Sequence, residues 1–170
     1  LLASACLPKL HRAVTIDDEP YWDGGYSANP AVYPLFYECR ARDILLVLLS
    51  PLRYESTPQS GEQIAERAME FAFSAHFMRE MRMFVNATRF ASGSWPALGR
   101  LERRLRGTRF HMVDSAAHAS LQRSDTKLLA HGPFLERLRD EGRACGQAWV
   151  SEHGGQVGRN SSVDLPSVFG

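Results

Sequence analysis

The chain has 170 residues, 44% hydrophobic and 23% charged, which is typical of one globular domain with its own core. A formal net charge of +1 excludes the strong positive field of a nucleic-acid-binding domain, so we expect no nucleic-acid partner. Three widely spaced cysteines, Cys6, Cys39 and Cys145, indicate free thiols rather than a disulfide framework and favour a reducing, cytoplasmic compartment.

Residues 1–7 predict the end of a helix, because the residue before Pro8 is pushed out of the helical region. The first residues contain no basic stretch followed by an apolar stretch, so the sequence predicts no signal peptide here. The first residue is Leu1, and we expect the chain to be the C-terminal part of a longer protein. Residues 14–16 predict a strand, residues 17–20 a polar turn, and residues 21–22 a second strand that leads to Asp23.

Asp23 is the first candidate functional residue, because two glycines, Gly24 and Gly25, follow it directly. Glycines let the backbone turn sharply and leave open space beside the carboxylate, which suits a general base. An Asp-Gly pair between short apolar segments is equally a signal for an ordinary hairpin turn. These residues alone do not choose between the two interpretations.

Residues 31–37 predict a short helix with Pro30 in its first turn and Asn29 as its N-cap. Residues 43–50 form a continuous apolar run without alternation, which is typical of a strand buried on both faces of a mostly parallel sheet. This run is the best indication of an α/β core. Its apolar part is far too short to span a bilayer, so we expect membrane contact to be peripheral at most.

A long helix is predicted to begin after Ser60, which forms a capping box with Gln63, and to end near residue 86. Apolar residues recur along it at helical spacing. They are Met69, Phe73, Phe77, Met81 and Phe84. We interpret this stripe as part of the core, and the alternative is a groove for an acyl chain, because methionine and phenylalanine adapt to flexible apolar ligands.

Residues 88–96 contain Gly, Ser and Pro and predict a loop with the character of a lid or a linker. Residues 98–109 then form a basic amphipathic segment with five arginines and one acidic residue. Arg100, Arg103 and Arg104 are its candidate contacts for lipid headgroups, because such a segment binds anionic membrane surfaces or phosphates. The alternative is a solvated, arginine-rich helix face.

Residues 110–113 predict another strand, near which His111, Asp114 and His118 are close in sequence. This spacing gives a weak hypothesis of a metal site, because no pair of the six histidines has the spacing of a helical zinc site. We therefore expect no metal.

The last predicted helix spans residues 133–153, with Pro133 at its start and glycines at its end. Its predicted buried face consists of Leu135, Leu138, Gly142, Cys145 and Trp149. On this face Cys145 is expected to be an inert core thiol. Residues 154–170 are rich in Gly and Ser and predict an extended tail.

Four short motifs surround the Asp23 turn. They are Ala3-Ser4-Ala5-Cys6-Leu7-Pro8, Val14-Thr15-Ile16, Tyr21-Trp22-Asp23-Gly24-Gly25 and Asn29-Pro30. Together they resemble the region around the catalytic aspartate of the patatin-like phospholipases. The later segment Gly158-Arg159-Asn160-Ser161-Ser162-Val163-Asp164-Leu165 looks like the ending of a bacterial subgroup that carries a helical C-terminal extension.

The resemblance implies a patatin-like, three-layer α/β/α fold. This chain would hold the C-terminal portion of the sheet and the helix-rich extension. We expect residues 1–60 to belong to the catalytic domain, residues 61–153 to form the helical extension packed on it, and residues 154–170 to form the tail.

Patatin-like enzymes hydrolyse lipid acyl esters with a Ser-Asp dyad and without a cofactor, and their serine lies in a Gly-x-Ser-x-Gly elbow. No such elbow occurs in these 170 residues. The resemblance therefore implies that Asp23 is the general base, supported by Gly24, Gly25, Asn29 and Pro30. The nucleophile and the oxyanion loop would lie in the missing N-terminal half of the same domain, and the chain alone is expected to be inactive.

Two other functions stay open from the sequence. One is a non-catalytic lipid-binding or partner-binding module that uses the basic segment from Arg100 to Arg109 and the Met/Phe helix. The other is a metal-dependent hydrolase centred on His111 and His118.

Overall fold

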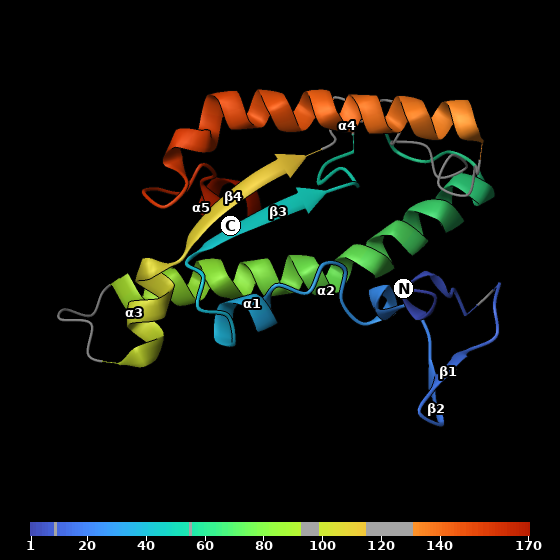
Figure 1. Ribbon diagram of the computed structural model, residues 1–170, viewed down its shortest axis with the longest axis horizontal. Coiled ribbons are helices and arrows are strands. Elements are labelled where there is room, and N and C mark those ends of the chain that lie inside the picture. Colours follow the sequence, from blue (N-terminus) through green and yellow to red (C-terminus); the bar gives the residue numbers. More distant parts are fainter. Residues whose placement is uncertain (9, 55, 93–98, 115–130) are drawn as a thin grey trace.

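The computed structural model consists of helices and short strands, and it describes residues 1–8, 10–54, 56–92, 99–114 and 131–170 (Figure 1). The strands are β1 (Val14–Ile16), β2 (Glu19–Tyr21), β3 (Asp43–Leu48) and β4 (Arg109–Asp114). The α-helices are α1 (Tyr33–Tyr37), α2 (Gly61–Ser92), α3 (Arg100–Gly107), α4 (Gly132–His153) and α5 (Leu165–Phe169). Among the described residues, the 3-10 turns are η1 (Ala3–Ala5), η2 (Gly24–Tyr26) and η5 (Gly154–Gln156). The predicted mixed α/β class is confirmed.

The N-terminal segment differs in detail from the prediction. Only η1 is helical at the start of the chain, and β1 pairs with β2 in an antiparallel hairpin. The second strand ends at Tyr21, one residue earlier than predicted. It begins earlier because Asp17 and Asp18 both adopt positive φ, which closes the hairpin in two residues.

The second sheet consists of β3 and β4, which are parallel and in register from Asp43 opposite Arg109 to Leu48 opposite Asp114. The parallel arrangement expected for residues 43–50 is confirmed. The expected burial on both faces is wrong, because Leu45 and Val47 are 47% and 57% exposed while their neighbours Ile44 and Leu46 are buried. Helix α2 covers one face, and α4 covers the other only where it packs on β4.

Helix α2 begins with the predicted capping box. The Gln63 N–H donates to Ser60 Oγ at 3.2 Å, and the Ser60 N–H donates to the Gln63 side chain at 3.3 Å. The helix ends at Ser92, six residues later than predicted, so residues 88–92 of the expected loop are helical and residues 93–96 lie outside the described ones.

The Met/Phe stripe of α2 is part of the core in its second half only. Phe77, Met81 and Phe84 are buried, whereas Met69 is 37% exposed and Phe73 is half-buried. The reason is visible in Figure 1, where the N-terminal part of α2 extends beyond the sheet.

Helix α1 starts at Tyr33, two residues later than predicted, and its N-cap position is Val32 rather than Asn29. The peptide bond between Asn29 and Pro30 is cis. The cap comes instead from Glu80 of α2, whose carboxylate accepts from the Val32 N–H at 3.1 Å and from the Tyr33 N–H. This contact fixes α1 on the middle of α2.

Helix α4 matches its predicted span within one residue at its start. Its predicted buried face is only partly covered: Leu138, Cys145 and Trp149 are half-buried, while Leu135 and Gly142 are exposed. The strands beneath have six residues each, or about 20 Å, whereas the 22 residues of α4 span about 33 Å, so the sheet covers only part of the helix.

The C-terminal segment is not extended throughout, because it folds into η5 and α5. Phe169 of α5 is 2% exposed and its ring packs edge-on against Phe77 at 5.6 Å. The core thus combines side chains from all three predicted segments, such as Phe36, Met81 and Phe169. In the described part of the chain, no helix combines the length and the apolar character that crossing a membrane requires.

Candidate functional site

Asp23 lies directly after the β1–β2 hairpin, at the N-terminus of η2. Its backbone N–H donates to the Cys6 carbonyl at 2.9 Å, and the Trp22 indole donates to the His11 carbonyl at 3.2 Å. These bonds join the segment after η1 to the Asp-Gly-Gly turn. Two of the motifs that carry the family resemblance are therefore in contact.

The Asp23 carboxylate is held by one of its oxygens. Oδ1 accepts from the Gly25 N–H at 2.8 Å, an N-cap bond that fixes the side chain over the turn. The second oxygen has no hydrogen-bond partner in the described part of the chain, and the residue is half-exposed. A fixed carboxylate with one free, accessible oxygen can accept a proton from a group that approaches it.

The two glycines of the turn have different surroundings. A Cβ on Gly24 would meet no atom within 4 Å, whereas a Cβ on Gly25 would lie 3.1 Å from Asp23 Oδ1 and 3.7 Å from the Phe73 ring. Open space therefore lies beside Gly24, and Gly25 allows the turn to close on the carboxylate.

The turn is docked on the exposed half of α2 through aromatic rings. The Tyr26 and Phe73 rings pack with centroids 4.8 Å apart. The candidate headgroup residues Arg100, Arg103 and Arg104 lie on α3, at the opposite end of α2 (Figure 1). The structure therefore does not bring the two predicted sites together.

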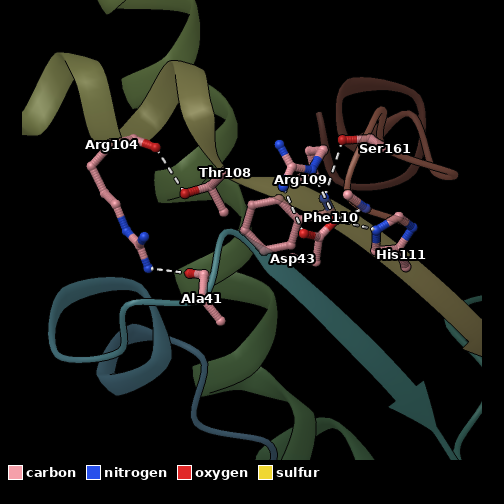
Figure 2. A network of polar contacts seen from close by, with 9 residues as sticks. Ala41, Asp43, Arg104, Thr108, Arg109, Phe110, His111 and Ser161 are labelled. Atoms are coloured by element: carbon pink, nitrogen blue, oxygen red, sulfur yellow. Dashed lines mark hydrogen bonds and ion pairs between the residues drawn. The ribbon is translucent and has the colours of Figure 1, made fainter. Parts of the chain in front are cut away.

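Sequence reasoning missed a second polar cluster, which is centred on Asp43 (Figure 2). The two carboxylate oxygens accept from Arg109 Nε at 2.8 Å and from an Arg109 Nη at 2.6 Å. Oδ1 also accepts from the Gly158 N–H at 2.9 Å and from His111 Nε2 at 3.1 Å. The bidentate Arg109 contact lowers the pKa of Asp43 far below its usual value, against the opposing effect of burial, and the Gly158 and His111 contacts add to the lowering.

His111 connects this cluster to the tail. A carboxylate only accepts hydrogen bonds, so Nε2 carries a proton, and Nδ1 lies 3.0 Å from Ser162 Oγ. Ser162, His111 and Asp43 thus share the connectivity of a Ser-His-Asp triad. Asp43 is occupied by Arg109, the His111 side chain is only 2% exposed, and the Ser162 N–H is bonded to the Phe110 carbonyl. We interpret the group as an anchor that holds the tail on β4.

The weak metal hypothesis receives no support in the described part of the chain. No group of three or more His, Cys, Asp or Glu side chains there could hold a metal ion. His118 lies outside the described residues, and Asp114 ends β4 three residues from the anchored His111.

The arginines of the basic segment have different roles. Arg104 donates to four carbonyls, those of Leu35, Phe36, Cys39 and Ala41, at 2.8 to 3.1 Å. Arg106 donates to the Ala91 carbonyl, and Arg109 pairs with Asp43. Arg100 and Arg103 are exposed, so the prediction of headgroup contact stays open for them, and Arg104 is a structural residue whatever else it contacts.

Comparison of the chain with family models, with curated proteins and with solved structures finds no match.

Proposed function

We propose that this chain supplies the general base of a serine acyl hydrolase that acts on lipid esters, and that Asp23 is this base. The observation that carries the proposal is the half-exposed Asp23 carboxylate, which is fixed through Oδ1 and whose second oxygen has no hydrogen-bond partner in the described part of the chain. The resemblance to the patatin-like phospholipases supports the same role.

The reaction needs only two side chains. A serine hydroxyl is a weak nucleophile until a base takes its proton during attack on the ester carbonyl, and a carboxylate within hydrogen-bond reach can do so without a histidine. The open space beside Gly24 gives the backbone of the nucleophile turn room to approach Asp23. The serine and the oxyanion donors belong to a segment that these 170 residues do not contain.

The three-layer α/β/α fold is also part of this proposal. Parallel sheets are normally covered on both faces and usually have about 4–6 strands. A two-stranded parallel sheet with Leu45 and Val47 exposed fits the C-terminal portion of a larger, three-layer α/β/α domain. We place its activity in the cytoplasm, with peripheral contact to membranes, where lipid esters are presented.

The test uses the full-length protein that contains these residues, assayed for hydrolysis of a short-chain nitrophenyl ester and of a phospholipid. Asp23→Asn keeps the size of the side chain and removes the base, so kcat falls by about 100-fold or more. Asp18→Asn, in the exposed hairpin turn, is the matched control and leaves kcat unchanged. Full activity of Asp23→Asn would refute the assignment.

A fluorophosphonate, which reacts with activated serines, locates the nucleophile independently. We expect the label on a serine outside these 170 residues, and its loss in Asp23→Asn. A label on Ser162 would instead assign catalysis to the Ser162–His111–Asp43 group and would contradict the proposal.

The alternative of a non-catalytic lipid-binding module is weakened in one part. Phe77, Met81 and Phe84 of the Met/Phe helix pack in the core and cannot also contact lipid. Its other part, the basic segment, keeps exposed charge at Arg100 and Arg103.

A further inference from the structure

A basic cavity of about 750 Å³ lies between α3 and the segment that joins α1 to β3. Its volume falls within the roughly 300–1,000 Å³ typical of small-molecule sites. Apolar side chains, including Phe36, Tyr37 and Leu101, form part of its wall. It is a second candidate site, remote from Asp23.

The charge of this cavity is strongly one-sided. Five arginines line it, and Glu38 is the one carboxylate among its lining residues. They are Arg40, Arg42, Arg100, Arg103 and Arg104. In the described part of the chain none of the five forms an ion pair. Gathered guanidinium groups repel one another, and a bound anion relieves this repulsion.

Arg104 makes the cavity a built feature rather than a chance gathering of mobile side chains. Its four bonds to carbonyl oxygens of residues 35–41 fix the guanidinium in place, and Figure 2 shows it directed at Ala41. The carbonyls accept from Nε and one Nη of Arg104 but leave its positive charge without a counter-ion. Because the Arg104 side chain is already fixed before a ligand binds, its ordering adds little to the entropic cost of binding.

The loop side of the cavity is also held in place. The Arg42 carbonyl accepts from the Arg109 N–H at 2.7 Å, which ties the loop to the start of β4. The Arg42 guanidinium lies close to Gly107, about where a Cβ would touch it at 4.0 Å. The Arg42 guanidinium therefore lies near the end of α3.

We propose that this cavity binds a dianionic phosphate group. Four charges in excess over Glu38 call for a ligand with more than one negative charge. Planar guanidinium groups bind phosphate oxygens through paired N–H donors. The apolar wall at Tyr37 and Leu101 would contact whatever the phosphate is attached to.

The site is independent of the proposed hydrolase. Phe73, which contacts the Asp23 turn, and Ala91, which contacts α3, lie 18 residues apart on α2. At 1.5 Å per residue this separates the two regions by roughly 27 Å of helix. The proposed phosphate site can therefore be refuted while the proposed hydrolase function stands, and the reverse.

The test compares two variants that remove equal charge. Arg40→Gln/Arg103→Gln takes one exposed arginine from each side of the cavity, and neither side chain makes a hydrogen bond or ion pair in the described part of the chain. Arg12→Gln/Arg79→Gln removes two exposed arginines that do not line it. Arg104 stays in both variants because the loop depends on it.

Two sets of probes distinguish the sources of the phosphate. Calorimetry with pyrophosphate and phenyl phosphate measures soluble ligands, and flotation with phosphatidylcholine vesicles, with or without phosphatidic acid, measures a lipid headgroup. We expect binding in at least one arm, weakened about tenfold or more by the cavity variant and unchanged in the control variant. Absence of binding in both arms, or equal weakening by both variants, would overturn the proposal.

Discussion

Asp43→Asn is the sharpest test of how the tail is held. Asp43 accepts four hydrogen bonds, of which Arg109 donates two (Figure 2). Asparagine replaces one acceptor oxygen by an NH₂ group, which would face the Arg109 donors, and leaves the guanidinium without its counter-charge. Breaking a buried ion pair costs roughly 3–5 kcal/mol, and the Asp43 side chain is 25% exposed, so we expect a loss of about 3 kcal/mol.

Thermal unfolding of the full chain by circular dichroism measures this loss. For a domain of this size, about 3 kcal/mol lowers Tm by roughly 6–12 °C. The matched control is Asp17→Asn in the exposed hairpin turn, where asparagine tolerates the positive φ and the change is expected within about 0.5 kcal/mol. Equal Tm values for the two variants would refute the anchor interpretation.

The difference in stability between the wild-type chain and Asp43→Asn should also depend on pH, in a direction that follows from the pKa of Asp43. Contacts with Arg109 lower the pKa of folded Asp43 below its ordinary value of 3.8. The stabilisation is therefore fully present above that value and is lost as the pH falls towards the folded pKa. The difference in Tm between the wild-type chain and Asp43→Asn should narrow below about pH 4. A difference that stays constant down to strongly acidic pH would contradict this reasoning.

Two further predictions concern α2 and the loop before it. Met81→Ala, at a fully buried position, should lower the free energy of unfolding by about 2–4 kcal/mol. The control Met83→Ala, where 65% of the residue is exposed, should change it by less than about 0.5 kcal/mol. Similar urea midpoints for the two variants would contradict the assigned buried face of α2. Burial and the Glu70 carboxylate raise the pKa of Tyr54 to about 12, so the stability gained by keeping this phenol neutral is present below its ordinary pKa of 10.0 and is lost as the pH rises through about 12. Tyr54→Phe should remove one tyrosine ionisation near pH 12 from the ultraviolet titration, and an unchanged titration would contradict the raised pKa of Tyr54.

Local signals predicted the elements whose partners are near in sequence. The capping box joins residues three positions apart, and the hairpin of β1 and β2 closes in two residues, so both appear in the sequence as short patterns. The strand at residues 110–113 and the helix at residues 133–153 also follow from local composition, and both occur in the structure.

Distant partners explain most of the differences. Glu80 caps α1 from 48 residues away, and the Gly158 N–H reaches Asp43 across 115 residues. No periodicity reveals such pairs, because each needs a fold that brings the two segments together. For the same reason the sequence showed Asp43 only as the first residue of an apolar run, although its carboxylate accepts four hydrogen bonds in the structure.

The basic segment shows how one such contact creates a candidate site. The sequence predicted a cationic helix, but spacing alone could not tell which arginines face solvent. Helix α1 ends at Tyr37, so carbonyls of its last turn lack helical partners, and Arg104 binds those of Leu35 and Phe36. Arg104 also donates to the carbonyls of Cys39 and Ala41, in the loop between α1 and β3. These bonds hold the loop against α3, so that Arg40 and Arg42 lie opposite Arg100 and Arg103.

The contact that completes α1 therefore also concentrates the positive charge. Neutralising Arg104 would release the loop as well as remove a charge, and its effect on phosphate binding would not separate the two roles. The exposed arginines make that separation possible, because the described structure gives them no hydrogen bonds and their only evident cost is mutual repulsion. Five arginines without ion pairs in the described part of the chain repel one another around the cavity, which is unfavourable for the folded chain by itself, and a bound phosphate relieves that repulsion.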